Sequence, residues 1–166
     1  MICKITNEKI KPFMSFGKMP IANGFIAKKD FKKEFFFKME VGFSKKVSLF
    51  QLNEHPKPQQ MFNKNYPFFT SSSKGMVNHF KEYSEWIKKN FKKDLKNLIE
   101  IGSNDGTFLK NFKEYNKVGF EPSGSVHKVA KSKGINSINK FFNFESIKPF
   151  IKKKVKFDVI VGSNVI

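Results

Sequence analysis

The pattern of apolar and polar positions changes character near residue 96. From there to residue 166, short apolar runs alternate with segments of helical spacing. The runs NLIEIG, KVGFEP, INSI and FDVIVG predict strands, and the segments GTFLKNFKEY, GSVHKVAKSKG and FFNFESIKPFIKK predict helices. Gly134 is the expected C-cap of the second helix, and Pro149 is expected to interrupt the third. Repeated strand–helix–strand units predict an α/β domain with a parallel sheet and helices on its faces.

The pattern upstream is different. Residues 1–60 are rich in Gly and Pro, and the segments EFFFKMEVGF and KKVSLFQL predict short strands, which indicates a small, irregular β-rich domain. Residues 61–95 are interpreted as a helical connector, with one helix from about Lys74 to Phe91 and three serines before it as candidate N-caps. Its buried face is expected to hold the apolar residues Met76, Phe80, Tyr83, Trp86 or Ile87, and Phe91.

Composition narrows the class of protein. The chain of 166 residues is 39% hydrophobic and contains 22 Phe, which is enough for a core. It has no apolar run of the length that a membrane helix needs, and its first residues lack the apolar region of a signal peptide. The single cysteine, Cys3, excludes an internal disulfide and fits a reducing compartment. A soluble, cytoplasmic protein without a membrane partner is expected.

The formal net charge of +18 raises the question of nucleic acid. All 32 basic residues are Lys, whereas Arg is the residue best suited to bidentate contacts with guanine and phosphate. The lysines are also spread along the chain, in pairs and in one cluster at 152–154. We interpret them as solvated surface and expect no nucleic-acid partner, although an anionic small ligand would benefit from the field.

The candidate chemistry lies in the segment EIGSNDG, residues 100–106. Gly102 and Gly106 allow close approach of the backbone to a ligand at the carboxyl end of a strand, where parallel sheets bind their ligands. Glu100 and Asp105 would repel a phosphate but suit a ligand that carries an ammonium and a sulfonium. Glu121 ends the next strand, where an acidic side chain can bind both hydroxyls of a ribose. With the later DVIVGSN segment, these features indicate S-adenosylmethionine (SAM), against the simpler alternative of a β–α turn with a satisfied cap.

Five segments together resemble the sugar C-methyltransferases that act on nucleotide-linked deoxysugars. They are MPIANGF, YPFFTSSSKGMVNHF, IEIGSNDGTFLKNF, GFEPSGSVHKVAKSKGI and FDVIVGSNVI, and they extend over nearly the whole chain. The resemblance implies a partial Rossmann-like class I methyltransferase sheet over residues 96–166, preceded by a degenerate zinc-binding-like domain over residues 1–60. It also implies SAM as cofactor and a nucleotide-sugar substrate.

The resemblance further implies roles for individual residues. The methionine portion of SAM would be held by Glu100, Gly102, Ser103, Asn104, Asp105 and Gly106. Glu121 would bind the ribose, and Pro122 would shape the turn beneath the adenine. Phe142 and Asn143 would contact the adenine, with core packing as the alternative for Phe142. Gly162, Ser163 and Asn164 would face the methyl group. Ser71, Ser72 and His79 are weaker candidates for substrate contact, with helix capping as the simpler role of the serines.

Two departures from the family pattern change these expectations. The family binds structural zinc through two Cys-x-x-Cys pairs, but here Cys3 remains while Thr6, Ser44 and Val47 occupy the other positions, so no metal is expected. The domain must then be held by packing, for which its Phe residues are the candidates. The family's catalytic His would follow Ile166, and only four strands of the sheet are found. The chain is therefore expected to be an inactive fragment of a methyltransferase, with the catalytic residue unknown.

The resulting hypothesis is SAM-dependent C-methylation of a keto-deoxysugar. A base would remove the proton next to the ketone, and the enolate carbon would attack the methyl group. Methylation of another small-molecule acceptor, or a non-catalytic module that binds SAM or a nucleotide, remain alternatives. The sugar, the methylated carbon and the oligomeric state are not determined by the sequence.

Overall fold

The computed structural model describes residues 1–91, 95–163 and 165, which form two compact units, Met1–Met61 and Phe62–Ile166. Asn164, one of the predicted site residues, lies outside the described residues. None of the helices in the described ranges has the length and apolar character that crossing a bilayer requires.

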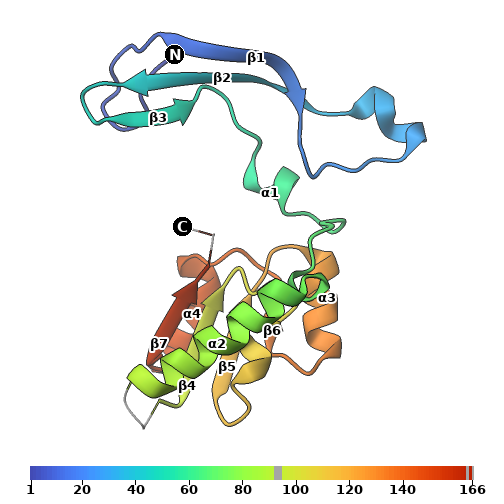
Figure 1. The fold of residues 1–166 in the computed structure, drawn as a ribbon, viewed down its shortest axis with the longest axis vertical. Helices are drawn as coiled ribbons and strands as arrows, with labels where there is room; N and C mark the ends of the chain where they lie inside the picture. The colour runs from blue at the N-terminus through green and yellow to red at the C-terminus, as the bar shows by residue number, and fades with distance from the viewer. Residues whose placement is uncertain (92–94, 164, 166) are drawn as a thin grey trace. The chain divides into compact units, whose positions relative to one another are not determined.

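The N-terminal unit contains a three-stranded antiparallel sheet, with β2 between β1 and β3 (Figure 1). The strands are β1 (Pro12–Pro20), β2 (Phe36–Ser44) and β3 (Leu49–Leu52), and the helical segments are the 3-10 helix η1 (Lys28–Lys33) and the short helix α1 (Pro58–Met61). The sequence pattern predicted β2 and β3 but not β1. Gly17, with φ of 72°, sits in an irregularity of the β1–β2 register and breaks the alternation that would have marked β1 as a strand.

The phenylalanines do not form the core of this unit. Within Met1–Met61, Phe13, Phe16, Phe25 and Phe50 are each more than half exposed, and the buried positions of β2 are Glu40, Gly42 and Ser44. The expectation that Phe packing replaces the missing zinc is therefore wrong. The buried side of β2 is polar and is held by hydrogen bonds.

The C-terminal unit contains a four-stranded parallel sheet in the order β6-β5-β4-β7. Its strands are β4 (Asn97–Ile101), β5 (Asn116–Phe120), β6 (Ser137–Ile138) and β7 (Val159–Gly162). Its helices are η2 (Thr70–Ser72), α2 (Lys74–Asn90), η3 (Leu109–Asn111), α3 (Gly124–Ser132) and α4 (Phe144–Lys152). The predicted α/β class with a preceding β-rich region is confirmed.

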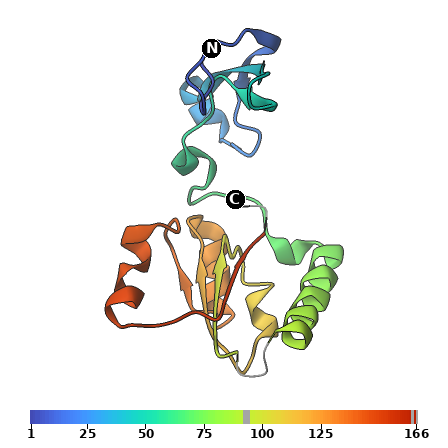
Figure 2. The same ribbon diagram turned by 90° about the vertical axis from the view of Figure 1, so that its left-hand side faces the viewer.

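Helices cover both faces of this sheet, as Figure 2 shows for α2 and α4. On one face, Phe80 and Ile87 of α2 pack with Leu98 of β4. On the other, Phe150 of α4 packs against Ile99 of β4. Because Leu98 and Ile99 are adjacent in one strand, their side chains point to opposite faces, so β4 is buried on both sides.

Helix α2 begins and ends close to the predicted bounds, but its buried face is narrower than predicted. Ser73 caps its start by accepting a hydrogen bond from the Met76 N–H at 3.3 Å. Ile87 is buried, whereas Trp86 is 53% exposed, which resolves the alternative between them. Met76 and Phe91 continue the stripe that contains Phe80 and Ile87 but are exposed, because Met76 lies in the first turn of the helix and Phe91 follows its last residue, Asn90.

Two predicted helices differ in detail. Only the short 3-10 helix η3 forms within 106–115, because the Asn111 amide donates to the Thr107 and Phe108 carbonyls at 3.2 and 3.0 Å and so competes with helical bonding. Helix α4 continues through Pro149, contrary to the predicted interruption. Pro149 and Glu145 are both exposed, so water can satisfy the Glu145 carbonyl that Pro149 leaves without an N–H.

Candidate functional site

The loop after β4 has an unusual backbone. Gly102, Asn104 and Gly106 have φ values of 68°, 48° and 76°, so three of five consecutive residues are left-handed. A Cβ at Gly102 would lie 2.3 Å from Val165, and one at Gly106 would lie 2.7 Å from Ile135. Both glycines are therefore required by the backbone conformation and by the packing around them.

The loop lies over the end of the neighbouring strand. The N–H groups of Gly102 and Ser103 both donate to the Phe120 carbonyl, at 2.8 and 3.0 Å. Strand β4 lies between β5, which follows it in sequence, and β7, which follows much later. This change of direction in strand order is the position at which open parallel sheets bind ligands, beyond the carboxyl ends of the strands.

Glu121 connects the loop to the end of β5. One carboxylate oxygen accepts from the Asn104 N–H at 2.9 Å and the other from the Ser123 N–H at 2.7 Å. The side chain is 5% exposed. Since a carboxylate can accept about four hydrogen bonds, Glu121 keeps acceptor capacity beyond these two contacts.

Asn104 is occupied by protein contacts. Its side-chain oxygen accepts from the N–H groups of Thr70 and Asp105, both at 2.9 Å, and its amide donates to the Phe68 carbonyl at 3.0 Å. These bonds tie the loop to the segment that precedes α2. The Asn104 side chain, which the sequence-based interpretation assigned to SAM, is therefore engaged within the protein.

Asp105 is fully buried and has three donors. It accepts from the Thr107 hydroxyl at 2.7 Å, from the Ser71 N–H at 3.2 Å and from the Lys133 ammonium at 3.1 Å. Burial alone would raise the pKa of Asp105, but the hydrogen bonds from Ser71, Thr107 and Lys133 outweigh it, so the pKa is lowered. This charged carboxylate joins the loop, η2 and the end of α3.

Glu100 is in the opposite situation. It is 3% exposed, and its Oε2 atom has no hydrogen-bond partner among the described residues. Burial raises the pKa of Glu100 well above its ordinary value, and the negative charges of Glu121 and Asp105 raise it further. The Ser103 and Ser123 hydroxyl oxygens are likewise buried and unpartnered in the described structure. Such atoms are uncommon in folded proteins, because buried polar groups are usually hydrogen-bonded to protein, water or a ligand.

Pro122, Gly162 and Ser163, which were also predicted as site residues, lie at or near the same edge. Asn139 donates to the carbonyls of Glu121 and Pro122, both at 2.8 Å, and so fixes the turn after β5. Gly162 ends β7 beside Ile101, and Ser163 follows it. Both are brought to the end of the sheet that carries the loop.

Phe142 and Asn143 have structural contacts. The Phe142 ring lies edge-on to the buried Phe120 ring, with centroids 5.3 Å apart, although Phe142 itself remains 37% exposed. Asn143 caps α4 by accepting from the Ser146 N–H at 2.9 Å, in a reciprocal capping box.

The three weaker candidates differ from one another. Ser71 reaches the loop through its N–H to Asp105, and Lys133 donates to its hydroxyl at 3.5 Å. The Ser72 hydroxyl donates to the Phe69 carbonyl at 2.7 Å, as in a local turn. His79 is exposed on α2, where its ring stacks on Tyr83 with centroids 6.2 Å apart.

Sequence reasoning missed Lys133, Thr107 and Tyr66. Lys133 follows α3 and is 28 residues from Asp105, so no local signal marks it as a partner. Thr107 is next to the recognised loop, where a hydroxyl two residues after an Asp was a signal that could have been used. Tyr66 begins the segment YPFFTSSSKGMVNHF. Burial, together with the charge of Glu121, raises the pKa of its hydroxyl.

In the N-terminal unit, hydrogen bonds hold the region that corresponds to the zinc-binding positions of the resembled family. The Cys3 sulfur accepts from the Gln51 amide at 3.2 Å and the Thr6 N–H at 3.5 Å, and the Ser44 hydroxyl donates to Glu8 at 2.5 Å. No group of three or more His, Cys, Asp or Glu in the described ranges could hold a metal ion. A single thiol with an amide and hydroxyls does not fit a closed tetrahedral zinc site.

Comparison with known proteins gives one family match and structural similarities. Residues 2–62 match the family model Methyltransf_13, described as "Putative zinc binding domain". No curated protein matches the chain. Among the solved structures that match is the plantazolicin methyltransferase BamL, in complex with a triazolic desmethylPZN analog and SAH. It is 22% identical, with a TM-score of 0.33, and the match covers 51% of this chain and 32% of that one.

Proposed function

We propose that the edge of the parallel sheet binds SAM and that the protein belongs to a SAM-dependent methyltransferase. The proposal rests mainly on one observation: the carboxyl end of the parallel sheet is acidic and contains hydrogen-bond acceptors without a partner among the described residues. Glu100, Asp105 and Glu121 lie at the ends of adjacent strands, and only Asp105 is paired with a cation among the described residues. Such an edge disfavours a phosphate and favours a cationic ligand.

The available atoms fit SAM in part. Glu121 has remaining acceptor capacity for the ribose hydroxyls, and Glu100 has an unpartnered oxygen for a donor such as the ammonium. Ser103 and Ser123 offer unpartnered hydroxyl oxygens beside them. Asn104 and Asp105 hold the loop in shape, so we assign them a positioning role.

When bound, SAM would supply a methyl group on a sulfonium. The contribution of this chain is then to fix the ligand between the loop and the ends of β5 and β7, since orientation of two reactants is a large part of such catalysis. A docked ammonium would also favour the ionised form of Glu100, whose pKa is raised by burial.

The finer assignment is C-methylation of a nucleotide-linked keto-deoxysugar. It is supported by the resemblance of five segments to that enzyme family, including MPIANGF and YPFFTSSSKGMVNHF outside the SAM loop. Another small-molecule acceptor, or a binding module without catalysis, would use the same edge, and the acceptor must be identified by assay.

Calorimetric titration of the chain with SAM and with S-adenosylhomocysteine (SAH) tests the proposal. Glu121→Gln should weaken binding about tenfold or more, because it removes a charged acceptor. Glu145→Gln is the matched control, since Glu145 is exposed on α4 and forms only a surface ion pair with Lys148 at 3.5 Å. A folded chain that binds neither ligand, or equal affinities of the parent, Glu121→Gln and Glu100→Gln proteins, would refute the site.

A further inference from the structure

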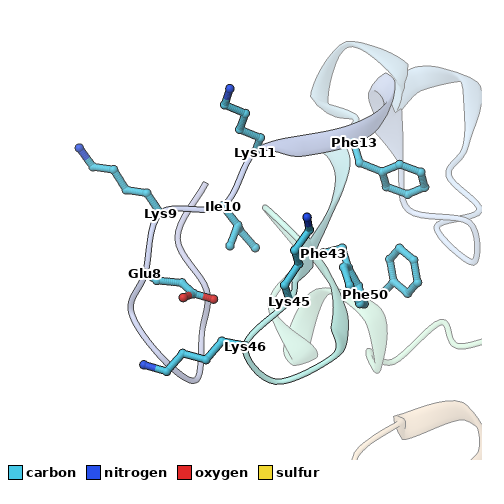
Figure 3. Close-up of a pocket in the computed structure, with 9 residues that line it drawn as sticks. All are labelled: Glu8, Lys9, Ile10, Lys11, Phe13, Phe43, Lys45, Lys46 and Phe50. Atoms are coloured by element: carbon cyan, nitrogen blue, oxygen red, sulfur yellow. The ribbon is translucent and has the colours of Figure 1, made fainter.

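A hollow of about 700 Å³ in the N-terminal unit combines phenyl rings with ammonium groups (Figure 3). The rings of Phe13, Phe43 and Phe50 come from the three strands of the antiparallel sheet. The lysines come from the segment before β1 and from the turn between β2 and β3, and they are Lys9, Lys11, Lys45 and Lys46. The volume lies within the range of roughly 300–1,000 Å³ that is usual for small-molecule sites.

The three rings form one aromatic surface that is open to solvent. Phe43 and Phe50 are directly opposite in the β2–β3 register, with ring centroids 4.7 Å apart, and Phe13 lies 5.6 Å from Phe50. Phe13 and Phe50 are 62% and 60% exposed. The rings contact one another, so a ligand would lie on their open faces. A planar aromatic group is the partner that such a surface favours.

The charge around the rings indicates the chemistry of the part of the ligand that does not lie on them. Four lysines and one carboxylate, Glu8, give the hollow a formal charge of +3, and Glu8 already accepts the Ser44 hydroxyl. In Figure 3 the side chains of Lys9, Lys11 and Lys46 point outward, away from the phenyl rings, whereas the Lys45 side chain is drawn beside Phe43. A second copy of this chain is a poor occupant, because each copy carries a net charge of +18. An anion with several negative charges is a suitable occupant, because it is attracted by the positive charge of the hollow.

We propose that this hollow binds a nucleoside phosphate, with the base on the rings and the phosphates among the lysines. A single strand of nucleic acid is less suited, since such surfaces follow the backbone over several nucleotides with successive stacking platforms. The ligand can be a free nucleotide or the nucleotide of a larger metabolite. All of the residues lie within Met1–Met61, so this site does not depend on SAM binding in the other unit.

Calorimetry on the whole chain, without SAM, tests this with uridine diphosphate, UDP-glucose, uridine, inorganic pyrophosphate and a short oligothymidine. UDP should bind more tightly than uridine or pyrophosphate, because only UDP offers both base and phosphates. UDP-glucose that binds at least as tightly as UDP identifies the larger metabolite as the source, whereas weaker binding identifies the free nucleotide.

Two pairs of variants separate the contributions. Phe50→Leu should weaken UDP binding about fivefold and leave pyrophosphate unchanged. The double variant Lys45→Gln/Lys46→Gln should weaken both by about tenfold. Phe25→Leu and Lys28→Gln/Lys29→Gln are the controls: Phe25 is 75% exposed in the same unit, and none of the three residues lines the hollow. Circular dichroism must show that each variant folds.

Three results would overturn the proposal. One is pyrophosphate binding equal to UDP binding with no effect of Phe50→Leu, because the rings would then play no part. Another is oligothymidine binding that is far tighter than UDP binding and falls steeply with salt, which would indicate nucleic acid. The third is an equal loss of UDP affinity in the control variants and the test variants. Since SAM is absent from the assay, failure of the SAM proposal would leave these results unaffected.

Discussion

Replacement of Asp105 by Asn tests how the loop after β4 is held. Asp105 is fully buried and accepts from Thr107, Ser71 and Lys133. In Asp105→Asn, one side-chain oxygen can still accept from Thr107. The other becomes an amide nitrogen, and this donor then faces two further donors, the Ser71 N–H and the Lys133 ammonium.

The expected cost follows from these two lost contacts. Hydrogen bonds to charged groups contribute about 1.5–3 kcal/mol each, and removal of one partner of a buried ion pair costs about 3–5 kcal/mol. The Lys133 side chain is 36% exposed, so water screens the ion pair with Asp105 and reduces its contribution to the cost. We therefore expect Asp105→Asn to lower the free energy of unfolding by about 2–4 kcal/mol.

Urea denaturation followed by the fluorescence of Trp86 measures this cost. Trp86 is the single tryptophan and lies on α2, so the signal reports on the C-terminal unit. Lys133→Gln is the matched control and should cost about 1 kcal/mol, because Asp105 keeps its other two donors. The double variant should cost less than the sum of the two, since the shared contact is removed once.

The pH dependence adds an independent check. The pKa of Asp105 is lowered in the fold, so its stabilisation is complete above the ordinary value of 3.8 and is lost as the pH falls through the lowered pKa. The difference between parent and Asp105→Asn should therefore be constant near neutrality and shrink only below about pH 3.8. A cost under 1 kcal/mol at pH 7, or a cost that shrinks already near pH 6, would refute this account of the loop.

Two further predictions follow from the buried groups. Because the pKa of Glu100 is raised, the parent protein should lose stability as the pH rises from 4.5 through the raised pKa. The Glu100→Gln variant should lack that loss and should be more stable than the parent at pH 7. Equal stability–pH profiles of the two proteins, measured by urea denaturation, would contradict this. The purified chain should contain no stoichiometric zinc, and EDTA should not change its melting temperature, because hydrogen bonds occupy the Cys3 sulfur; one zinc per chain by mass spectrometry of the native protein would contradict this.

The strands of the parallel sheet could be predicted from the sequence because their signal is local. A strand buried on both faces, such as β4, is a short apolar run bounded by turn residues, and this pattern survives without knowledge of its neighbours. The loop could be located for the same reason, since Gly102 and Gly106 are needed by the backbone itself. The segment of η3 was predicted as a longer helix, because the competing bonds of the Asn111 amide depend on the folded geometry.

The partners of the site residues could not be predicted, because they come from distant segments. Ser71 is 34 residues before Asp105 and Lys133 is 28 residues after it, and nothing in the spacing of either indicates a contact. The exposure of the phenylalanines was also not apparent. Composition alone suggests a core, whereas the structure leaves Phe13 and Phe50 open because β2 buries polar residues on its other face.

The three carboxylates of the sheet edge differ in what they can do, although the sequence makes them look equivalent. Asp105 is satisfied by three donors and needs no ligand. Glu121 is held by two N–H groups and has acceptor capacity left. Glu100 is buried with one oxygen unpartnered, so a donor that reached it would relieve an unfavourable burial. Substitution of Glu100 or Glu121 should therefore weaken the binding of a cationic ligand most. Substitution of Asp105 should affect binding only through the shape of the loop.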